Sequence, residues 1–289
     1  MSFLQAGDAR LAWQQMGEGP DVVLVHGLAT NRAFWYASLA QALRDRYRVT
    51  LFDLRGHGYS SRPASGYSAT AMAADLAALV DGLALAPAVV IAHSYGGAVA
   101  LEYALSAPDA VRGLVLMDAR INTLQPRQWL SDGGKLSAFD KEMAAADGRD
   151  WESEPQLGLT FLESMARLRV EGYEPQNRDI FTPFGQGKSG LRGARAFCRL
   201  MDETTMREDA LVPGADRDAI AGLRMPLQLL YGGNSHNLPS GDALAECVPQ
   251  SEYHRLPDVG HFFPLSHPEM VAPLVRAFLE RLDGAAASV

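Results

Sequence analysis

Short runs of apolar residues alternate with longer amphipathic stretches along the first 118 residues of the chain. The main apolar runs have the length of strands that are buried on both faces, and the stretches between them have the length of helices. This alternation predicts a mostly parallel sheet with helices on both faces. Two earlier runs, separated by Gly7 and Asp8, predict a hairpin at the start of the sheet. The predicted strands are residues 3–5, 11–16, 22–26, 48–53, 88–92 and 111–118, and the predicted helices are residues 33–43, 69–83 and 95–106.

The alternation stops after Asp118 and resumes only with apolar runs at residues 226–232 and 252–258, which a helix near residues 268–282 follows. A structureless loop of the intervening length is uncommon in a compact domain. The interruption therefore predicts a helical insertion that follows the sixth strand and packs over one end of the sheet. We expect a core domain formed by residues 1–121 and 223–289 and an insertion formed by residues 122–222.

Composition and charge narrow the class of protein. The formal net charge is −8, which disfavours a nucleic-acid partner because phosphate binding needs a basic face. The two cysteines, Cys198 and Cys247, cannot form a disulfide framework, and neither lies at metal-ligand spacing. The first residues lack the basic and apolar regions of a secretory signal, and no apolar run is long enough to cross a bilayer. These features favour a soluble cytoplasmic protein without a membrane partner.

Ser94 follows the predicted strand at 88–92 in the sequence Ala92-His93-Ser94-Tyr95-Gly96-Gly97, which leads into a predicted helix. A serine at a sharp turn between a strand and a helix is exposed as a nucleophile, and small neighbours let the chain make that turn. The first glycine of the usual G-x-S-x-G pattern is replaced here by Ala92, the next smallest residue. A serine after a strand is otherwise often a helix cap, but this context favours a nucleophile.

With these motifs the chain resembles the α/β-hydrolases that carry a helical cap domain. The resemblance covers nearly the whole chain and is specific for the fold, and much less so for the substrate. Further segments that match the family are VLVHGLATNRAFW at 23–35, FDLRGHGYSSRP at 52–63 and VGHFFPLSHPE at 259–269.

The resemblance implies an oxyanion hole formed by the backbone N–H groups of Leu28 and Tyr95. It also implies structural roles for His26, at the start of the oxyanion loop, and for His93, which precedes the nucleophile in many relatives. The residues expected to hold the backbone near the site are Asp53, Arg55 and His57.

The resemblance also implies a catalytic triad of a serine, an acid and a histidine, in that chain order. His261 is the expected base because it lies between the last predicted strand and the terminal helix. Many relatives place the acid after the strand that corresponds to 226–232, but no carboxylate occurs at residues 232–237. Some relatives place it after the preceding strand, where this chain has Asp118. We expect Asp118 to be the acid, with Asp242 and Asp258 as alternatives.

Aromatic residues beside these segments are expected to form an apolar substrate pocket under the cap. The predicted lining residues are Phe34, Trp35, Tyr95, Phe262 and Phe263.

The resulting hypothesis is a serine hydrolase that cleaves a carboxylic ester, thioester or lactone through an acyl-enzyme on Ser94, without a metal or an organic cofactor. The substrate would be a small, partly apolar molecule. A serine at this position disfavours the epoxide hydrolase and haloalkane dehalogenase reactions, which need an attacking carboxylate. Two alternatives remain open: an acyltransferase or biosynthetic acyl-releasing enzyme that uses the same serine, and a noncatalytic ligand-binding member of the fold.

Overall fold

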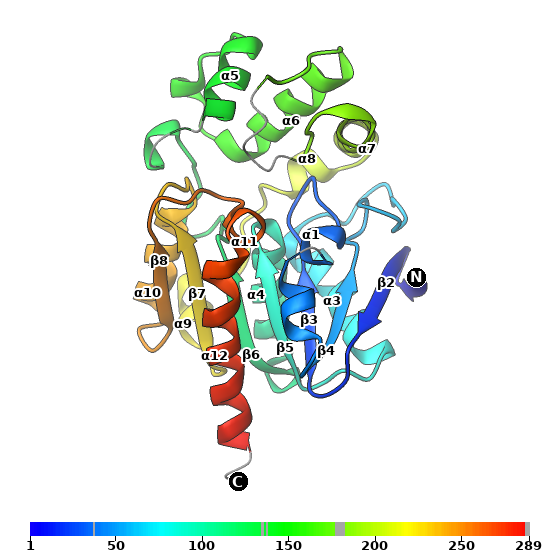
Figure 1. Ribbon diagram of the computed structural model, residues 1–289, viewed down its shortest axis with the longest axis vertical. Helices are drawn as coiled ribbons and strands as arrows, with labels where there is room; N and C mark the ends of the chain where they lie inside the picture. Colours follow the sequence, from blue (N-terminus) through cyan, green and yellow to red (C-terminus); the bar gives the residue numbers. More distant parts are fainter. Residues whose placement is uncertain (37, 134–135, 137, 177–182, 287–289) are drawn as a thin grey trace.

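A computed structural model describes residues 1–36, 38–133, 136, 138–176 and 183–286 of the chain (Figure 1). The eight strands within these described ranges form one sheet. They are β1 (Ser2–Ala6), β2 (Ala9–Met16), β3 (Asp21–Val25), β4 (Arg48–Phe52), β5 (Ala88–His93), β6 (Val111–Met117), β7 (Leu227–Gly232) and β8 (Glu252–Leu256).

The strand order is β1-β2-β4-β3-β5-β6-β7-β8. The N-terminal hairpin places β2 antiparallel to both β1 and β4, and the other neighbouring pairs are parallel. The predicted mostly parallel α/β sheet is therefore confirmed, and each predicted strand is present within a few residues of its expected bounds.

Helices cover both faces of the sheet (Figure 1). Alternate residues of the central strands point to opposite faces: Val90 of β5 joins one core cluster, whereas Val89 and Ile91 join the other. The helices on the first face are α3 (Ala69–Gly82), α4 (Tyr95–Ser106) and α10 (Leu238–Cys247). Those on the second face are α1 (Ala33–Tyr36), α2 (Leu39–Leu43), α11 (Phe263–Ser266) and α12 (Pro268–Ala286). The short 3₁₀ helix η1 (Pro108–Ala110) precedes β6.

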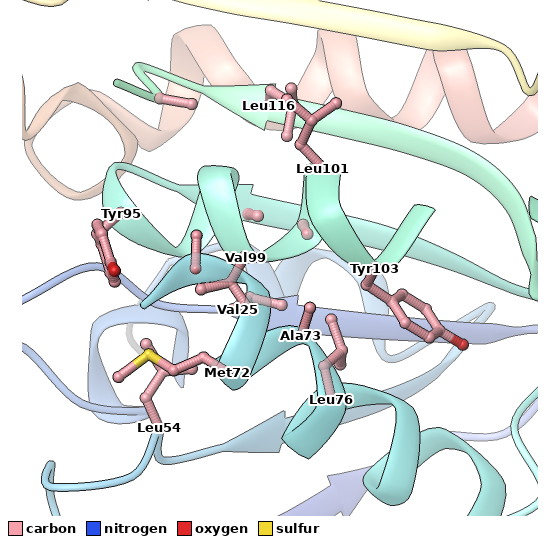
Figure 2. Close-up of a cluster of buried hydrophobic side chains, with 14 of the residues drawn as sticks. Val25, Leu54, Met72, Ala73, Leu76, Tyr95, Val99, Leu101, Tyr103 and Leu116 are labelled. Carbon is pink, nitrogen blue, oxygen red and sulfur yellow. The ribbon is translucent and has the colours of Figure 1, made fainter. Parts of the chain in front are cut away.

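Figure 2 shows the packing on the first face, where Met72 and Leu76 of α3, Val99 of α4 and Val25 of β3 belong to one buried cluster. These four side chains are fully buried. Because α4 begins directly after Ser94, this packing fixes the helix that follows the predicted nucleophile.

The predicted helix at 33–43 is divided in the structure. Helix α1 ends at Tyr36 and α2 begins at Leu39. Ser38 has a nonhelical backbone, and its hydroxyl donates to the carbonyl oxygen of Phe34 at 3.0 Å. A serine that bonds to the backbone in this way favours a turn over a continued helix.

The segment between β6 and β7 is helical. Its helices α5 to α8 lie beyond the carboxyl ends of the parallel strands, whereas α9 lies with the sheet and packs against α10 (Figure 1). Their bounds are α5 (Ala138–Asp147), α6 (Leu157–Val170), α7 (Gly187–Glu203), α8 (Met206–Asp209) and α9 (Arg217–Ala221), with short 3₁₀ helices η2 (Leu130–Asp132) and η3 (Trp151–Ser153).

Candidate active site

Ser94 lies at the turn between β5 and α4, with φ 57° and ψ −127°. This left-handed φ is strained for a residue with a side chain, and such strain is tolerated where the surrounding packing enforces it. Ala92 is fully buried within β5, so the alanine that departs from the usual motif fits as a small strand residue.

Two glycines let the loop after β3 approach this turn closely. A Cβ added to Gly27 would lie 2.7 Å from Ser94 Cβ and 3.2 Å from Ser94 Oγ. A Cβ added to Gly96 would lie 2.4 Å from the carbonyl oxygen of His26. Larger side chains would therefore force the loop and the turn apart.

The structure brings Ser94, His261 and Asp118 together. His261 Nε2 lies 3.0 Å from Ser94 Oγ, and His261 Nδ1 lies 2.6 Å from Asp118 Oδ2. Ser94 and Asp118 follow neighbouring strands, since His93 pairs with Met117 in the β5–β6 register. His261 comes from the loop between β8 and α11. A base between a hydroxyl and a carboxylate is the arrangement that activates a serine.

Asp118 is fully buried, and donors from the loop after β7 hold its carboxylate. Its Oδ1 accepts the N–H of Gly232 at 2.9 Å, and its Oδ2 accepts the hydroxyl of Ser235 in a short hydrogen bond. Asn237 Nδ2 donates to the carbonyl oxygen of Asp118 at 2.8 Å and lies 3.3 Å from His261 Nδ1. With Nδ1 donating to Asp118, His261 Nε2 is free to accept the Ser94 proton.

Ser235 and Asn237 are site residues that the sequence motifs did not predict. One feature of the sequence pointed to them: residues 232–237 include side chains that can donate hydrogen bonds, at the place where many relatives have the acid. The loop after β7 thus supports a carboxylate that comes from the end of β6.

The alternative acids lie elsewhere. Asp242 Oδ1 accepts the Tyr253 hydroxyl at 2.7 Å and also pairs with Arg255. Asp258 is exposed at the cavity rim. Asp118 is the carboxylate that contacts His261 among the residues that the structure describes.

Two buried histidines hold the backbone of the site. His93 Nε2 donates to the carbonyl oxygen of His261 at 2.9 Å, and burial lowers the pKa of His93 well below its ordinary value. His26 Nε2 accepts the N–H of Leu54 at 3.0 Å, while its Nδ1 donates to the carbonyl oxygen of Gly27 at 2.8 Å. Burial lowers the pKa of His26 to about 3, so this ring stays neutral.

The segment after β4 is held by further polar contacts. Asp53 accepts the backbone N–H groups of Arg32 at 2.8 Å and of Tyr59 at 2.9 Å. Arg55 forms a buried ion pair with Asp75, with Nε 2.6 Å from Oδ2. His57 donates from Nδ1 to the carbonyl oxygen of Arg55 at 2.9 Å.

A cavity of about 530 Å³ opens onto Ser94 and His261. Leu28, Tyr95 and Phe262 line it, together with residues of the segment between β6 and β7. The residues that this segment contributes include Arg120, Gln128, Phe139, Trp151, Phe161 and Met165.

Three aromatic residues predicted to line the pocket lie instead in the core on the second face of the sheet. Trp35 and Phe263 are fully buried, and Phe34 is 4% exposed. Phe34 stacks on the ring of His93, with 4.8 Å between ring centroids. They lie close to site segments in sequence, but they belong to the core cluster that also contains residues of β5 and α12, and they are not among the residues that line the cavity.

Among the described residues, His, Cys, Asp and Glu side chains form no group of three or more that could hold a metal ion. Within the same part of the chain, no helix has the length and apolar character needed to cross a membrane.

The chain belongs to the α/β hydrolase fold family, whose model matches residues 20–268. It is 35% identical to a proposed carbamate hydrolase from Azorhizobium caulinodans, over 98% of this chain and 100% of the relative. It is 30% identical to a pimeloyl-acyl-carrier-protein methyl ester esterase from Chromobacterium violaceum, over 93% and 97% of the two chains. The enol-lactonase from Burkholderia xenovorans has the same fold, with a TM-score of 0.67, 20% identity and coverage of 96% of this chain and 100% of that one.

The family and the two relatives make the protein an enzyme of the hydrolase class, related to an ester hydrolase. This membership disfavours the noncatalytic alternative. The predicted family resemblance is confirmed.

Proposed function

We propose that the protein is a serine hydrolase that cleaves a carboxylic ester or a related acyl bond through an acyl-enzyme on Ser94. The observation that carries the proposal is the chain of contacts from Ser94 Oγ through His261 to Asp118, at the floor of a cavity of about 530 Å³. The esterase and the proposed carbamate hydrolase among its relatives support a carbonyl compound as the substrate.

In the proposed reaction, His261 Nε2 takes the proton of Ser94 as the hydroxyl attacks the carbonyl carbon. The buried carboxylate of Asp118 holds the ring and stabilises the imidazolium that forms. His261 then gives the proton to the leaving alcohol. In the second half, His261 takes a proton from water, which attacks the acyl-enzyme and releases the acid.

The backbone N–H groups of Leu28 and Tyr95 would bind the oxyanion. Both residues line the cavity beside Ser94. Tyr95 is the first residue of α4, where no preceding helical turn accepts its N–H and the helix dipole favours negative charge. Gly27 supports this role because it lets the loop that carries Leu28 approach Ser94.

We further propose that the insertion predicted at residues 122–222 acts, through its helices α5 to α8, as a cap that shapes the substrate pocket; α9, at the end of that range, lies with the sheet. Helices α5 and α6 contribute apolar side chains to the cavity, including Phe139, Phe161 and Met165. Such a lining favours a partly apolar acyl or alkyl group of moderate size.

Intact mass after treatment with a fluorophosphonate tests the nucleophile. We expect one adduct on the wild-type protein and none on Ser94→Ala, with Ser106→Ala as a control because Ser106 is an exposed serine at the end of α4. Absence of an adduct on folded wild type, also with a small sulfonyl fluoride, would contradict the proposal. Product analysis with an added alcohol or amine separates hydrolysis from acyl transfer.

A further inference from the structure

Arg120 places a positive charge in the wall of the substrate cavity. It follows Asp118 by two residues, and it lines the same cavity as Ser94 and His261. The site described above gives this side chain no part in the reaction. The cavity is otherwise lined largely by apolar side chains, so a guanidinium there needs an explanation.

The contacts of the Arg120 guanidinium are all with neutral oxygens. Nε and Nη2 lie 3.4 Å from the carbonyl oxygen of Gln125, and Nη2 also lies 3.3 Å from that of Pro126. Nη2 donates to Gln156 Oε1 at 2.5 Å. Nη1 has no hydrogen bond to any residue that the structure describes. These bonds fix one side of the guanidinium and leave Nη1 available.

Arg120 differs from the other described arginines that are not exposed, because it lacks a carboxylate partner. Buried Arg55 pairs with Asp75, and buried Arg169 pairs with Glu174 at 2.9 Å. Within the described ranges, Arg120 is the one arginine that is not exposed and has no carboxylate within 4.0 Å. A charge removed from water without an opposite charge is costly.

The nearby carboxylates do not supply that opposite charge at contact distance. Asp132 acts on Arg120 only from beyond 4.0 Å, and its Oδ2 accepts the N–H of Trp129 at 2.8 Å. Asp140 also lines the cavity, where its charge acts on His236. Burial lowers the pKa of Arg120 to about 10, so the guanidinium remains charged at neutral pH.

We infer that Arg120 binds a carboxylate of the substrate, and that the natural substrate is an ester or related acyl compound with a second, unreactive carboxylate. Nη1 carries two N–H donors, and a charge-assisted hydrogen bond from a guanidinium to a carboxylate is stronger than one to a neutral oxygen. Apolar residues such as Phe161 and Met165 would contact the hydrocarbon part of the same molecule. The inference rests on the proposed serine hydrolase, because it concerns the substrate of that site.

Matched substrates test the inference. Monomethyl esters of aliphatic dicarboxylic acids are compared with methyl esters of the same length that end in a carboxamide. We expect the wild-type kcat/KM to be at least tenfold higher for the best carboxylate than for its carboxamide. In Arg120→Gln the ratio should fall at least tenfold. Arg224→Gln, an exposed arginine just before β7, should keep the wild-type ratio.

A wild-type ratio near one, or an unchanged ratio in Arg120→Gln, would overturn the inference. If Arg120→Gln does not fold, Arg120→Lys decides. It keeps a positive charge but has no counterpart of Nη1, so the ratio should fall at least threefold, and an unchanged ratio counts against the role.

The experiment distinguishes failure of the role of Arg120 from failure of the proposed serine hydrolase. Turnover of the carboxamide esters without a carboxylate preference would leave the serine hydrolase standing and reject the role of Arg120. If neither ester is cleaved, calorimetry with Ser94→Ala still tests the site. The monomethyl dicarboxylate should then bind at least tenfold more tightly than its carboxamide, and the Ser94→Ala/Arg120→Gln protein should lose that difference; equal binding would reject the inference.

Discussion

Asp118 makes the contact on which the proposed mechanism depends most. Because its Oδ2 holds His261 Nδ1 at 2.6 Å, Asp118→Asn should favour the wrong tautomer of the ring. We expect kcat to fall roughly 10³–10⁴-fold, with KM nearly unchanged. Steady-state hydrolysis of an activated ester measures this loss.

Ser235→Ala is the matched control for that change. It removes one donor to Asp118 and leaves the carboxylate in place, so a loss of about ten- to a hundredfold is expected. Equal activity of Asp118→Asn and the wild type would show that another group orients His261.

Because the acid follows β6, whereas many relatives place it after the strand that corresponds to β7, the ends of these two strands give a further prediction. Asn237 lies after β7, and its Nδ2 is 3.3 Å from His261 Nδ1. In the double variant Asp118→Asn/Asn237→Asp, the carboxylate moves to the other strand end and can still accept from Nδ1. We expect at least a tenfold recovery of kcat over Asp118→Asn alone. No recovery in a folded double variant would show that position 237 cannot orient the ring.

The loop after β3 must lie close to the turn at Ser94. Gly27→Ala would place a methyl group 2.7 Å from Ser94 Cβ, so the nucleophile or the loop has to move. A shift of this kind is expected to lower the rate of fluorophosphonate labelling by at least about a hundredfold.

Gly284→Ala serves as the control, since a Cβ there meets no atom of the described residues within 4 Å. Labelling of Gly27→Ala at the wild-type rate would mean that the loop yields without cost to the site.

The sequence predicted the strands well because each buried strand is a continuous apolar run, which depends on local residues alone. It placed Phe34, Trp35 and Phe263 in the cavity wall because they are near site segments in sequence, and that nearness does not decide whether a side chain faces the cavity or the core: Phe262 lines the cavity, whereas Phe263 is buried in the core. The support of Asp118 by Ser235 and Asn237 could not be predicted, since it depends on how two distant loops meet. The contact geometry of Arg120 depends on the fold in the same way.

Across the whole molecule, buried neutral histidines should make the protein sensitive to acid. The pKa of His26 is lowered to about 3, against an ordinary value of 6.5, and burial also lowers the pKa values of His57 and His93. Between about pH 3 and pH 6.5, His26 binds a proton in the unfolded chain but not in the folded protein. The free energy of unfolding should therefore fall as pH falls below 6.5, with His26 contributing about 1.4 kcal/mol per pH unit.

Urea unfolding at pH 7.0, 5.5 and 4.5 measures this slope. In His26→Gln the protein should be less stable at pH 7, because the Leu54 and Gly27 contacts change, but its stability should depend less steeply on pH below 6.5. Parallel pH profiles for the two proteins would argue against a neutral buried His26.

The position of Asp118 at the end of β6 has a consequence for how such an enzyme can diversify. Ser94 and Asp118 both precede the helical segment in the chain, and their separation is fixed by the pairing of β5 with β6. Changes in the length of α5 to α8 therefore leave the strand pairing between the nucleophile and the acid in place. His261 comes from the chain that follows this segment, as do the donors Gly232, Ser235 and Asn237 that hold Asp118. New substrate ranges are thus open to this architecture at little risk to its chemistry.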